Sequence, residues 1–219
     1  MKINIPTKIT IVRIAGVVAL LGFYLAAYIA GPNSWASMTL GDSGIYLVNL
    51  IGCIVFILAS VTDFLDGYLA RKWHQVTTLG KFLDPIADKM LVNSSLIILA
   101  VAMPFYGGTN QLLVPWFCVV IMILRDLVVD TLRFVAASKG EVVAANIFGK
   151  LKTIFQMVAL PLIFLNGWPF TYFDGGWNPL LRVAMFFVYL ATAMSLISGI
   201  IYVIQNKHVL KEKTDGKDA

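Results

Sequence analysis

The 219 residues are 59% hydrophobic and only 13% charged, with a mean hydropathy of +0.82 and a formal net charge of +5. This composition excludes an ordinary soluble domain and is typical of an integral membrane protein, because each crossing of a bilayer needs about 20 mainly apolar residues. The basic residues are confined to alternate loops and do not cover one face, so binding to nucleic acid is not expected.

The apolar runs predict an all-α integral membrane protein with six transmembrane helices, folded as a single membrane domain over residues 1–219. In chain order, the expected spans are residues 9–30, 44–70, 85–103, 112–137, 145–165 and 180–204. Pro85 is expected in the first turn of the third helix, where proline is tolerated. Residues 1–8 form either an interfacial segment or a disordered end, and residues 205–219 form a charged tail.

Lysine and arginine are segregated to one side of the predicted spans. They occur near both termini, between the second and third spans, and between the fourth and fifth spans. The opposite loops, residues 31–43, 104–111 and 167–179, contain neither lysine nor arginine. The positive-inside rule therefore predicts that both termini lie in the cytoplasm, as an even number of spans also requires.

Four aspartates lie where the second span ends and the third begins. Asp63 and Asp66 are three residues apart and Asp84 and Asp88 are four apart, so each pair projects from one face of its helix. An acid at the centre of a membrane helix costs about 2.5–3.5 kcal/mol, which a bound partner must offset. If the two helices are antiparallel neighbours, the pairs converge, and four carboxylates suit two Mg²⁺ ions, with Mn²⁺ able to substitute.

Further residues around the acids describe a slot for a diphosphate. Gly67 and Gly80 remove side chains where a ligand would approach the backbone. Arg71 follows Gly67 on the same helical face and can contact a phosphate, and Thr77 offers a hydroxyl in the link between the helices. The alternative is that the acids form structural ion pairs with Arg71, Lys81 and Lys89.

These residues resemble the signature of the CDP-alcohol phosphotransferase family, D-x-x-D-G-x-x-A-R, eight residues, then G-x-x-x-D-x-x-x-D. The fixed positions are filled by Asp63, Asp66, Gly67, Ala70, Arg71, Gly80, Asp84 and Asp88. The resemblance implies a six-helix membrane bundle and a homodimer. It implies that Asp88 is the general base and that the metal ligands are Asp63, Asp66, Asp84 and Asp88. The implied contacts to the CDP group come from Gly67, Arg71, Thr77 and Gly80.

A second set of charged residues lies in the fourth and fifth spans. Its basic members are Arg125, Arg133, Lys150 and Lys152. The two arginines are eight residues apart and share a helical face. Charges inside a membrane span are expected to face a protein cavity, so this set predicts a basic pocket for an acceptor that carries a phosphate. Alternatively, the arginines form salt bridges to Asp126 and Asp130, or these acids hold the arginines in place.

This region and the N-terminal residues resemble the phosphatidylglycerolphosphate synthases of the same family. In the fourth and fifth spans, these synthases carry R-E, a downstream arginine and G-K-x-K-T, which are matched here by Arg125, Arg133, Lys150, Lys152 and Thr153, with Asp126 in place of Glu. Their opening pattern N-x-P-N-x-L-T-x-x-R is matched by Asn4, Pro6, Thr10 and Arg13, with Thr7 in place of Asn. The resemblance implies metal-assisted attack of the hydroxyl of sn-glycerol 3-phosphate on the β-phosphate of CDP-diacylglycerol. The products would be phosphatidylglycerol phosphate and CMP. The expected location is among the lipids of a bacterial cell membrane, with the active site on the cytoplasmic side.

The sequence leaves other functions open. Within the family, the acceptor could be inositol phosphate or phosphatidylglycerol. An intramembrane prenyltransferase also binds a diphosphate through metal-bound aspartates, but its acidic motifs lie much further apart along the chain. A divalent-cation transporter would place polar residues across the full depth of the bilayer, whereas the acids of this motif lie on one side.

Overall fold

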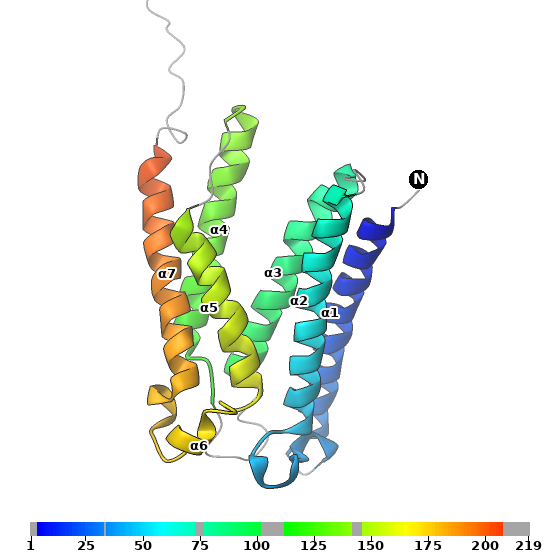
Figure 1. Ribbon diagram of the computed structural model, residues 1–219, viewed down its shortest axis with the longest axis vertical. Coiled ribbons are helices and arrows are strands. Elements are labelled where there is room, and N and C mark those ends of the chain that lie inside the picture. Colours follow the sequence, from blue (N-terminus) through cyan, green and yellow to red (C-terminus); the bar gives the residue numbers. More distant parts are fainter. Residues whose placement is uncertain (1–3, 33, 73–76, 102–111, 142–145, 208–219) are drawn as a thin grey trace, which may run out of the picture.

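The computed structural model describes residues 4–32, 34–72, 77–101, 112–141 and 146–207, and within them it contains helices and no strand (Figure 1). The long helices are α1 (Ile5–Ala30), α2 (Leu47–Lys72), α3 (Thr78–Val101), α4 (Trp116–Ser138), α5 (Ile147–Phe164) and α7 (Val183–Gln205). The short α6 (Thr171–Asp174) and three 3₁₀ turns, Trp35–Ser37, Gly41–Ser43 and Pro179–Leu181, complete the described part of the chain. The fold class is thus the expected all-helical one.

The long helices correspond one to one with the predicted spans, but two of them begin earlier. α3 begins at Thr78 and contains Pro85 in its interior, so the expectation that Pro85 lies in the first turn is wrong. Hydrogen bonds to α1 hold this early part of α3 in place, including one from Thr10 to Asp84. α1 begins at Ile5, so residues 5–8 continue the first helix and do not form a separate segment.

Within the described residues, α1, α5 and α7 are long and apolar enough to cross a membrane. α2, α3 and α4 are of comparable length and carry charged residues of the predicted site, as α5 does with Lys150 and Lys152. Charge is costly in a bilayer unless it faces protein or water, so the charged residues of these helices are expected to face the interior of the protein or water. Six transmembrane spans stay a prediction.

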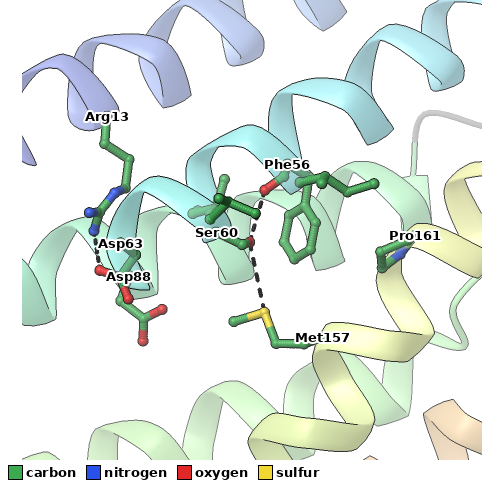
Figure 2. Close-up of a pocket in the computed structure, with 10 residues that line it drawn as sticks. Arg13, Phe56, Ser60, Asp63, Asp88, Met157 and Pro161 are labelled. Atoms are coloured by element: carbon green, nitrogen blue, oxygen red, sulfur yellow. Dashed lines mark hydrogen bonds and ion pairs between the residues drawn. The ribbon is translucent and has the colours of Figure 1, made fainter. Parts of the chain in front are cut away.

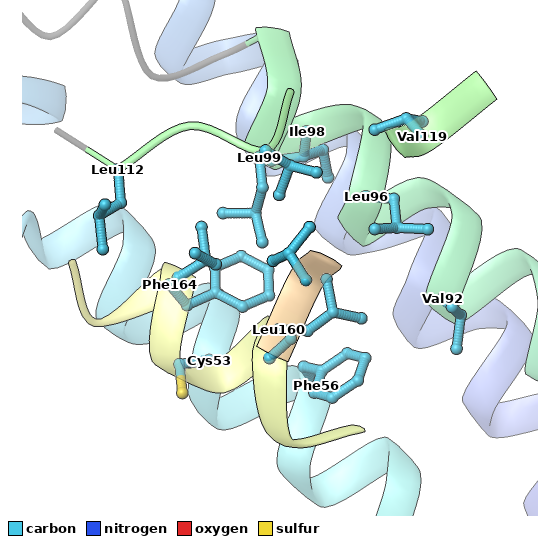
Figure 3. Close-up of a cluster of buried hydrophobic side chains, with 14 of the residues drawn as sticks. Cys53, Phe56, Val92, Leu96, Ile98, Leu99, Leu112, Val119, Leu160 and Phe164 are labelled. Atoms are coloured by element: carbon cyan, nitrogen blue, oxygen red, sulfur yellow. The ribbon is translucent and has the colours of Figure 1, made fainter. Parts of the chain in front are cut away.

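The helices pack in two groups, α1 with α2 and α3, and α7 with α4 and α5 (Figure 1). Contacts of α2 with α5 and of α3 with α4 and α5 join the groups. The buried core lies between them, with Phe56, Leu99 and Phe164 among its fully buried side chains (Figure 3). Large apolar side chains such as Val12 and Phe134 are exposed on the outside, as expected for helices that contact lipid.

Successive long helices run in opposite directions, so one end of the bundle collects alternate helix ends (Figure 1). The N-terminal ends of α1, α3 and α5 lie there with the C-terminal ends of α2, α4 and α7, whereas α6 lies at the opposite end. The acidic motif and the basic residues of α4 and α5 are thereby brought to the same end of the molecule, as the alternating charge of the loops predicts.

Candidate active site

Two of the predicted metal ligands, Asp63 of α2 and Asp88 of α3, line one pocket (Figure 2). The pocket has a volume of about 410 Å³, and most of its other lining residues are apolar. It extends past Ser60 and Met157, which lie on the facing sides of α2 and α5 and are joined by a hydrogen bond (Figure 2). A largely apolar pocket of this size with carboxylates at one end suits an amphipathic ligand whose polar head lies next to the acids.

Side chains of α1 contact two of the acids. Arg13 is buried and forms an ion pair with Asp63, whose side chain is still 42% exposed (Figure 2). Thr10, which is also buried, donates a hydrogen bond from Oγ1 to Asp84 Oδ1 at 2.9 Å. Sequence reasoning placed Thr10 and Arg13 in the opening pattern but missed these contacts. The signal was an arginine within an apolar span, which requires a partner inside the protein.

Thr77 and Gly80 lie against each other at the start of α3. The backbone N–H of Gly80 donates to Thr77 Oγ1 at 3.0 Å, and Thr77 Oγ1 lies 2.8 Å from Thr7 Oγ1 of α1. A Cβ on Gly80 would lie only 3.0 Å from Thr77 Oγ1 and 3.2 Å from Thr7 Oγ1. Gly80 thus permits close packing of α1 against α3, and its contact with the CDP group stays a prediction.

Four residues of the motif, Asp66, Gly67, Ala70 and Arg71, lie partly outside the described structure. α2 includes the backbone of all four, but their side chains and surroundings are not among the described parts. The metal-binding role of Asp66 and the CDP contacts of Gly67 and Arg71 therefore stay predictions.

The acids suit a hard cation by chemistry, since Mg²⁺ prefers carboxylate oxygens, and Asp63 and Asp88 line the same pocket. Within the described residues, however, no group of three or more Asp, Glu, His or Cys side chains is arranged to hold a metal ion. Instead, Arg13 donates a hydrogen bond to a carboxylate oxygen of Asp63, and Thr10 donates one to a carboxylate oxygen of Asp84. A cation bound between these acids would replace or share those contacts.

A second cluster joins α4 to α5 through Asp126. The buried Lys152 places Nζ 2.6 Å from both carboxylate oxygens of Asp126, and Arg125 Nη1 donates to Oδ1 at 3.0 Å. Arg125, Asp126 and Lys152 line a polar pocket of about 100 Å³ together with Asp88 and Lys89. That volume suits a small polar group. Asp88 and Met157 line both pockets, so the apolar pocket and the polar pocket are neighbours.

The structure brings two of the four predicted acceptor-binding residues, Arg125 and Lys152, into this polar pocket. Lys150 and Arg133 are exposed and are not among the residues that line it. Arg133 Nη2 donates to the Tyr202 hydroxyl at 2.7 Å. The guanidinium carbons of Arg125 and Arg133 lie 6.0 and 5.3 Å from the centre of the Tyr202 ring, so the prediction that the arginines share a helical face is confirmed.

The alternative of salt bridges within α4 is correct for one pair only. Arg125 pairs with Asp126 in the same helix, whereas Asp130 pairs with Lys89 of α3. Lys89 therefore connects α3 to α4, and among the described residues its ion-pair partner is Asp130 and none of the motif acids. The residues that sequence reasoning missed here are on α7, where Ser198 and Tyr202 contact the arginines.

Comparison with known proteins shows the family of the chain. Residues 3–199 match a family model described as CDP-alcohol phosphatidyltransferase. The chain is 41% identical over 209 residues to the CDP-diacylglycerol–glycerol-3-phosphate 3-phosphatidyltransferase of Bacillus subtilis, covering 95% of this chain and 97% of that protein. It is 38% identical over 216 residues to the protein of the same name from Mycoplasma pneumoniae, covering 96% and 90%. For the Salmonella typhimurium protein of that name, identity is 31% over 204 residues, covering 92% and 94%. The family match includes every residue that lines the two pockets.

Proposed function

Because this chain belongs to the CDP-alcohol phosphatidyltransferase family, we propose that it transfers a phosphatidyl group from CDP-diacylglycerol to sn-glycerol 3-phosphate. The observation that carries the proposal is the position of Asp88, which lines both the apolar pocket and the polar pocket. A lipid donor in the first pocket and a phosphorylated acceptor in the second would meet at this carboxylate. The relatives that are named for this reaction span almost the whole chain.

The apolar pocket suits the donor lipid. The glycerol backbone and the first carbons of the acyl chains would lie between α2 and α5, and the diphosphate would lie at the end formed by Asp63 and Asp88. The metal there would be Mg²⁺, two ions with Mn²⁺ able to substitute, and the ligands would be Asp63, Asp66, Asp84 and Asp88. When bound, the ions would neutralise charge on the diphosphate and on the departing CMP. The CDP contacts would come from Gly67, Arg71, Thr77 and Gly80.

The polar pocket suits the acceptor. Arg125 and Lys152 would bind the phosphate of glycerol 3-phosphate, and the three N–H donors of lysine allow Lys152 to keep its contact with Asp126. Asp88 would accept the proton of the acceptor hydroxyl. The hydroxyl oxygen would form a bond to the β-phosphorus, and the bond between that phosphorus and the oxygen of the departing CMP would break. Exposed Arg133 and Lys150 would attract the anionic acceptor from a distance.

The apolar helices and the family indicate a membrane protein. We infer that it is a multi-pass protein of a bacterial cell membrane, because the relatives compared above are bacterial. The segregation of lysine and arginine supports cytoplasmic termini and a cytoplasmic active site. The family resemblance supports a homodimer.

The test is to incubate the purified full-length protein with CDP-diacylglycerol and one acceptor at a time, and to measure CMP release. The acceptors are sn-glycerol 3-phosphate, inositol phosphate and phosphatidylglycerol. We expect release with glycerol 3-phosphate, its loss in EDTA and its recovery on addition of Mg²⁺. Release with another acceptor alone would overturn the acceptor assignment, and undiminished release in EDTA would overturn the metal. No release with any acceptor would overturn the proposed transfer.

A further inference from the structure

Arg125 passes between two helical glycines, Gly149 of α5 and Gly199 of α7. A Cβ on Gly199 would lie 2.9 Å from Arg125 Cγ and 3.8 Å from Arg125 Cβ, with no other neighbour within 4 Å. A Cβ on Gly149 would lie 3.1 Å from Arg125 Nη2 and would likewise meet no other atom within 4 Å. Neither glycine has a positive φ, so the backbone does not require glycine here. Among the described residues, Arg125 is therefore the neighbour that a side chain at either position would meet first.

Two hydrogen bonds fix the guanidinium of Arg125 in this position. Its Nε donates to Ser198 Oγ at 3.0 Å, and its Nη1 donates to Asp126 Oδ1 at 3.0 Å. The hydroxyl of Ser198, which is fully buried, donates in turn to the carbonyl of Ser195 at 3.0 Å. The oxygen of Ser198 is thereby oriented to accept from Arg125. Hydrogen bonds from a charged donor in a buried site are among the stronger ones in proteins.

These contacts use the Nε and Nη1 groups of Arg125, and neither of them uses Nη2. Among the described residues, Nη2 donates to no side chain or carbonyl, and Arg125 lines the polar pocket with Asp88 and Lys152. A planar guanidinium that is held through two of its nitrogens can still bind a phosphate through the N–H donors of the third. A long side chain that is already fixed also loses little conformational freedom when the anion binds, which favours affinity.

We propose that Gly149, Gly199 and Ser198 are positioning residues that hold Arg125 so that Nη2 binds the phosphate of a small phosphomonoester acceptor. The inference deepens the proposed function and rests on it. α7 is thus part of the acceptor site, although its own sequence between Val183 and Gln205 contains no charged residue.

The first test is Gly199→Ala, because the added methyl would meet Arg125 and nothing else within 4 Å. Alanine favours a helix over glycine, so the substitution does not weaken α7 through helix propensity. We expect the KM for sn-glycerol 3-phosphate to rise about tenfold, because displacement of a positioning group by a fraction of an ångström is costly. The KM for CDP-diacylglycerol and the Tm should stay unchanged. The matched control is Gly22→Ala in α1, where a Cβ would meet nothing within 4 Å.

The second test is Ser198→Ala, which removes the acceptor for Arg125 Nε. We expect the KM for glycerol 3-phosphate to rise roughly fivefold with little change in kcat, because the hydrogen bond acts on binding. The matched control is Ser195→Ala on the same helix. Ser195 is equally buried, and within the described structure its hydroxyl has no hydrogen-bond partner. Ser195→Ala should therefore leave both KM values unchanged.

A double-mutant cycle and a binding measurement complete the test. In the Arg125→Ala background, Gly199→Ala should cause no further loss, because its effect acts through Arg125. Calorimetric binding of sn-glycerol 3-phosphate, without the lipid donor, should weaken in Gly199→Ala and Ser198→Ala by the same factors as the KM. Additive losses, equal effects on the two substrates, or unchanged binding in both variants would overturn the positioning role. An unmodified protein that binds glycerol 3-phosphate but releases no CMP would overturn the proposed transfer instead. The calorimetric binding of glycerol 3-phosphate to the variants would then test the positioning role by itself.

Discussion

Asp126 neutralises two bases that are largely removed from water, and its loss should destabilise the protein. The side chains of Lys152, Arg125 and Asp126 are 6%, 12% and 14% exposed. Removal of one partner from a buried ion pair costs about 3–5 kcal/mol, because the other charge stays buried without compensation. An asparagine at this position can still accept a hydrogen bond from Lys152 Nζ. For Asp126→Asn we therefore expect the lower end, a loss of about 3 kcal/mol in the free energy of unfolding.

The assay is thermal unfolding in detergent, followed by the fluorescence of the five tryptophans. At about 2–4 °C per kcal/mol, the Tm of Asp126→Asn should fall by roughly 6–12 °C. Asp130→Asn is the matched comparison on the same helix. Its ion pair with Lys89 joins side chains that are 40% and 35% exposed, so its removal should cost only about 0–1 kcal/mol.

The double variant Asp126→Asn, Lys152→Met separates an uncompensated charge from a general loss of packing. Methionine fills similar space without a charge, so most of the lost stability should return, although acceptor binding should not. An Asp126→Asn variant with the same Tm as the unmodified protein would refute the reasoning. A double variant that melts no higher than the single one would refute it as well.

The remaining predictions concern the acids, the arginine of α1 and the two lysines of α5. Asp88→Asn should abolish CMP release while binding of CDP-diacylglycerol, measured by calorimetry, is retained. Arg13→Ala should lower CMP release about tenfold or more, because Asp63 loses its partner, and Arg13→Lys should recover part of it through the retained charge. Lys152→Met should raise the KM for glycerol 3-phosphate about tenfold, whereas Lys150→Ala, which removes an exposed lysine outside the polar pocket, should raise it no more than about twofold.

The spacing of charged residues predicted much of the candidate site. Intervals of three and four residues place side chains on one face of a helix, and a short link makes two helices antiparallel neighbours. Those two rules are sufficient to bring Asp63 and Asp88 to one pocket. The start of α3 was misjudged, because proline in a sequence suggests the beginning of a helix, and the contacts with α1 that extend α3 before Pro85 are not local in sequence.

Pairings between helices could not be predicted from the sequence, because they depend on which faces meet. Asp130 pairs with Lys89 of α3, although Arg133 is nearer to it along the chain. The contribution of α7 was missed for a different reason. An apolar helix with isolated serine, glycine and tyrosine residues is typical of any packed membrane span, and only the position of Arg125 gives Ser198 a specific role.

The division of the bundle into two helix groups has a consequence for how such enzymes diversify. The acids belong to α2 and α3, which pack with α1, whereas Arg125 and Lys152 belong to α4 and α5, supported by α7. With the roles proposed above, the choice of alcohol to be esterified would change through substitutions in the second group, while the residues that act on the nucleotide anhydride would be retained. Chimaeras that exchange α4 to α7 between relatives with different alcohols would inherit the alcohol preference of the donor of those helices.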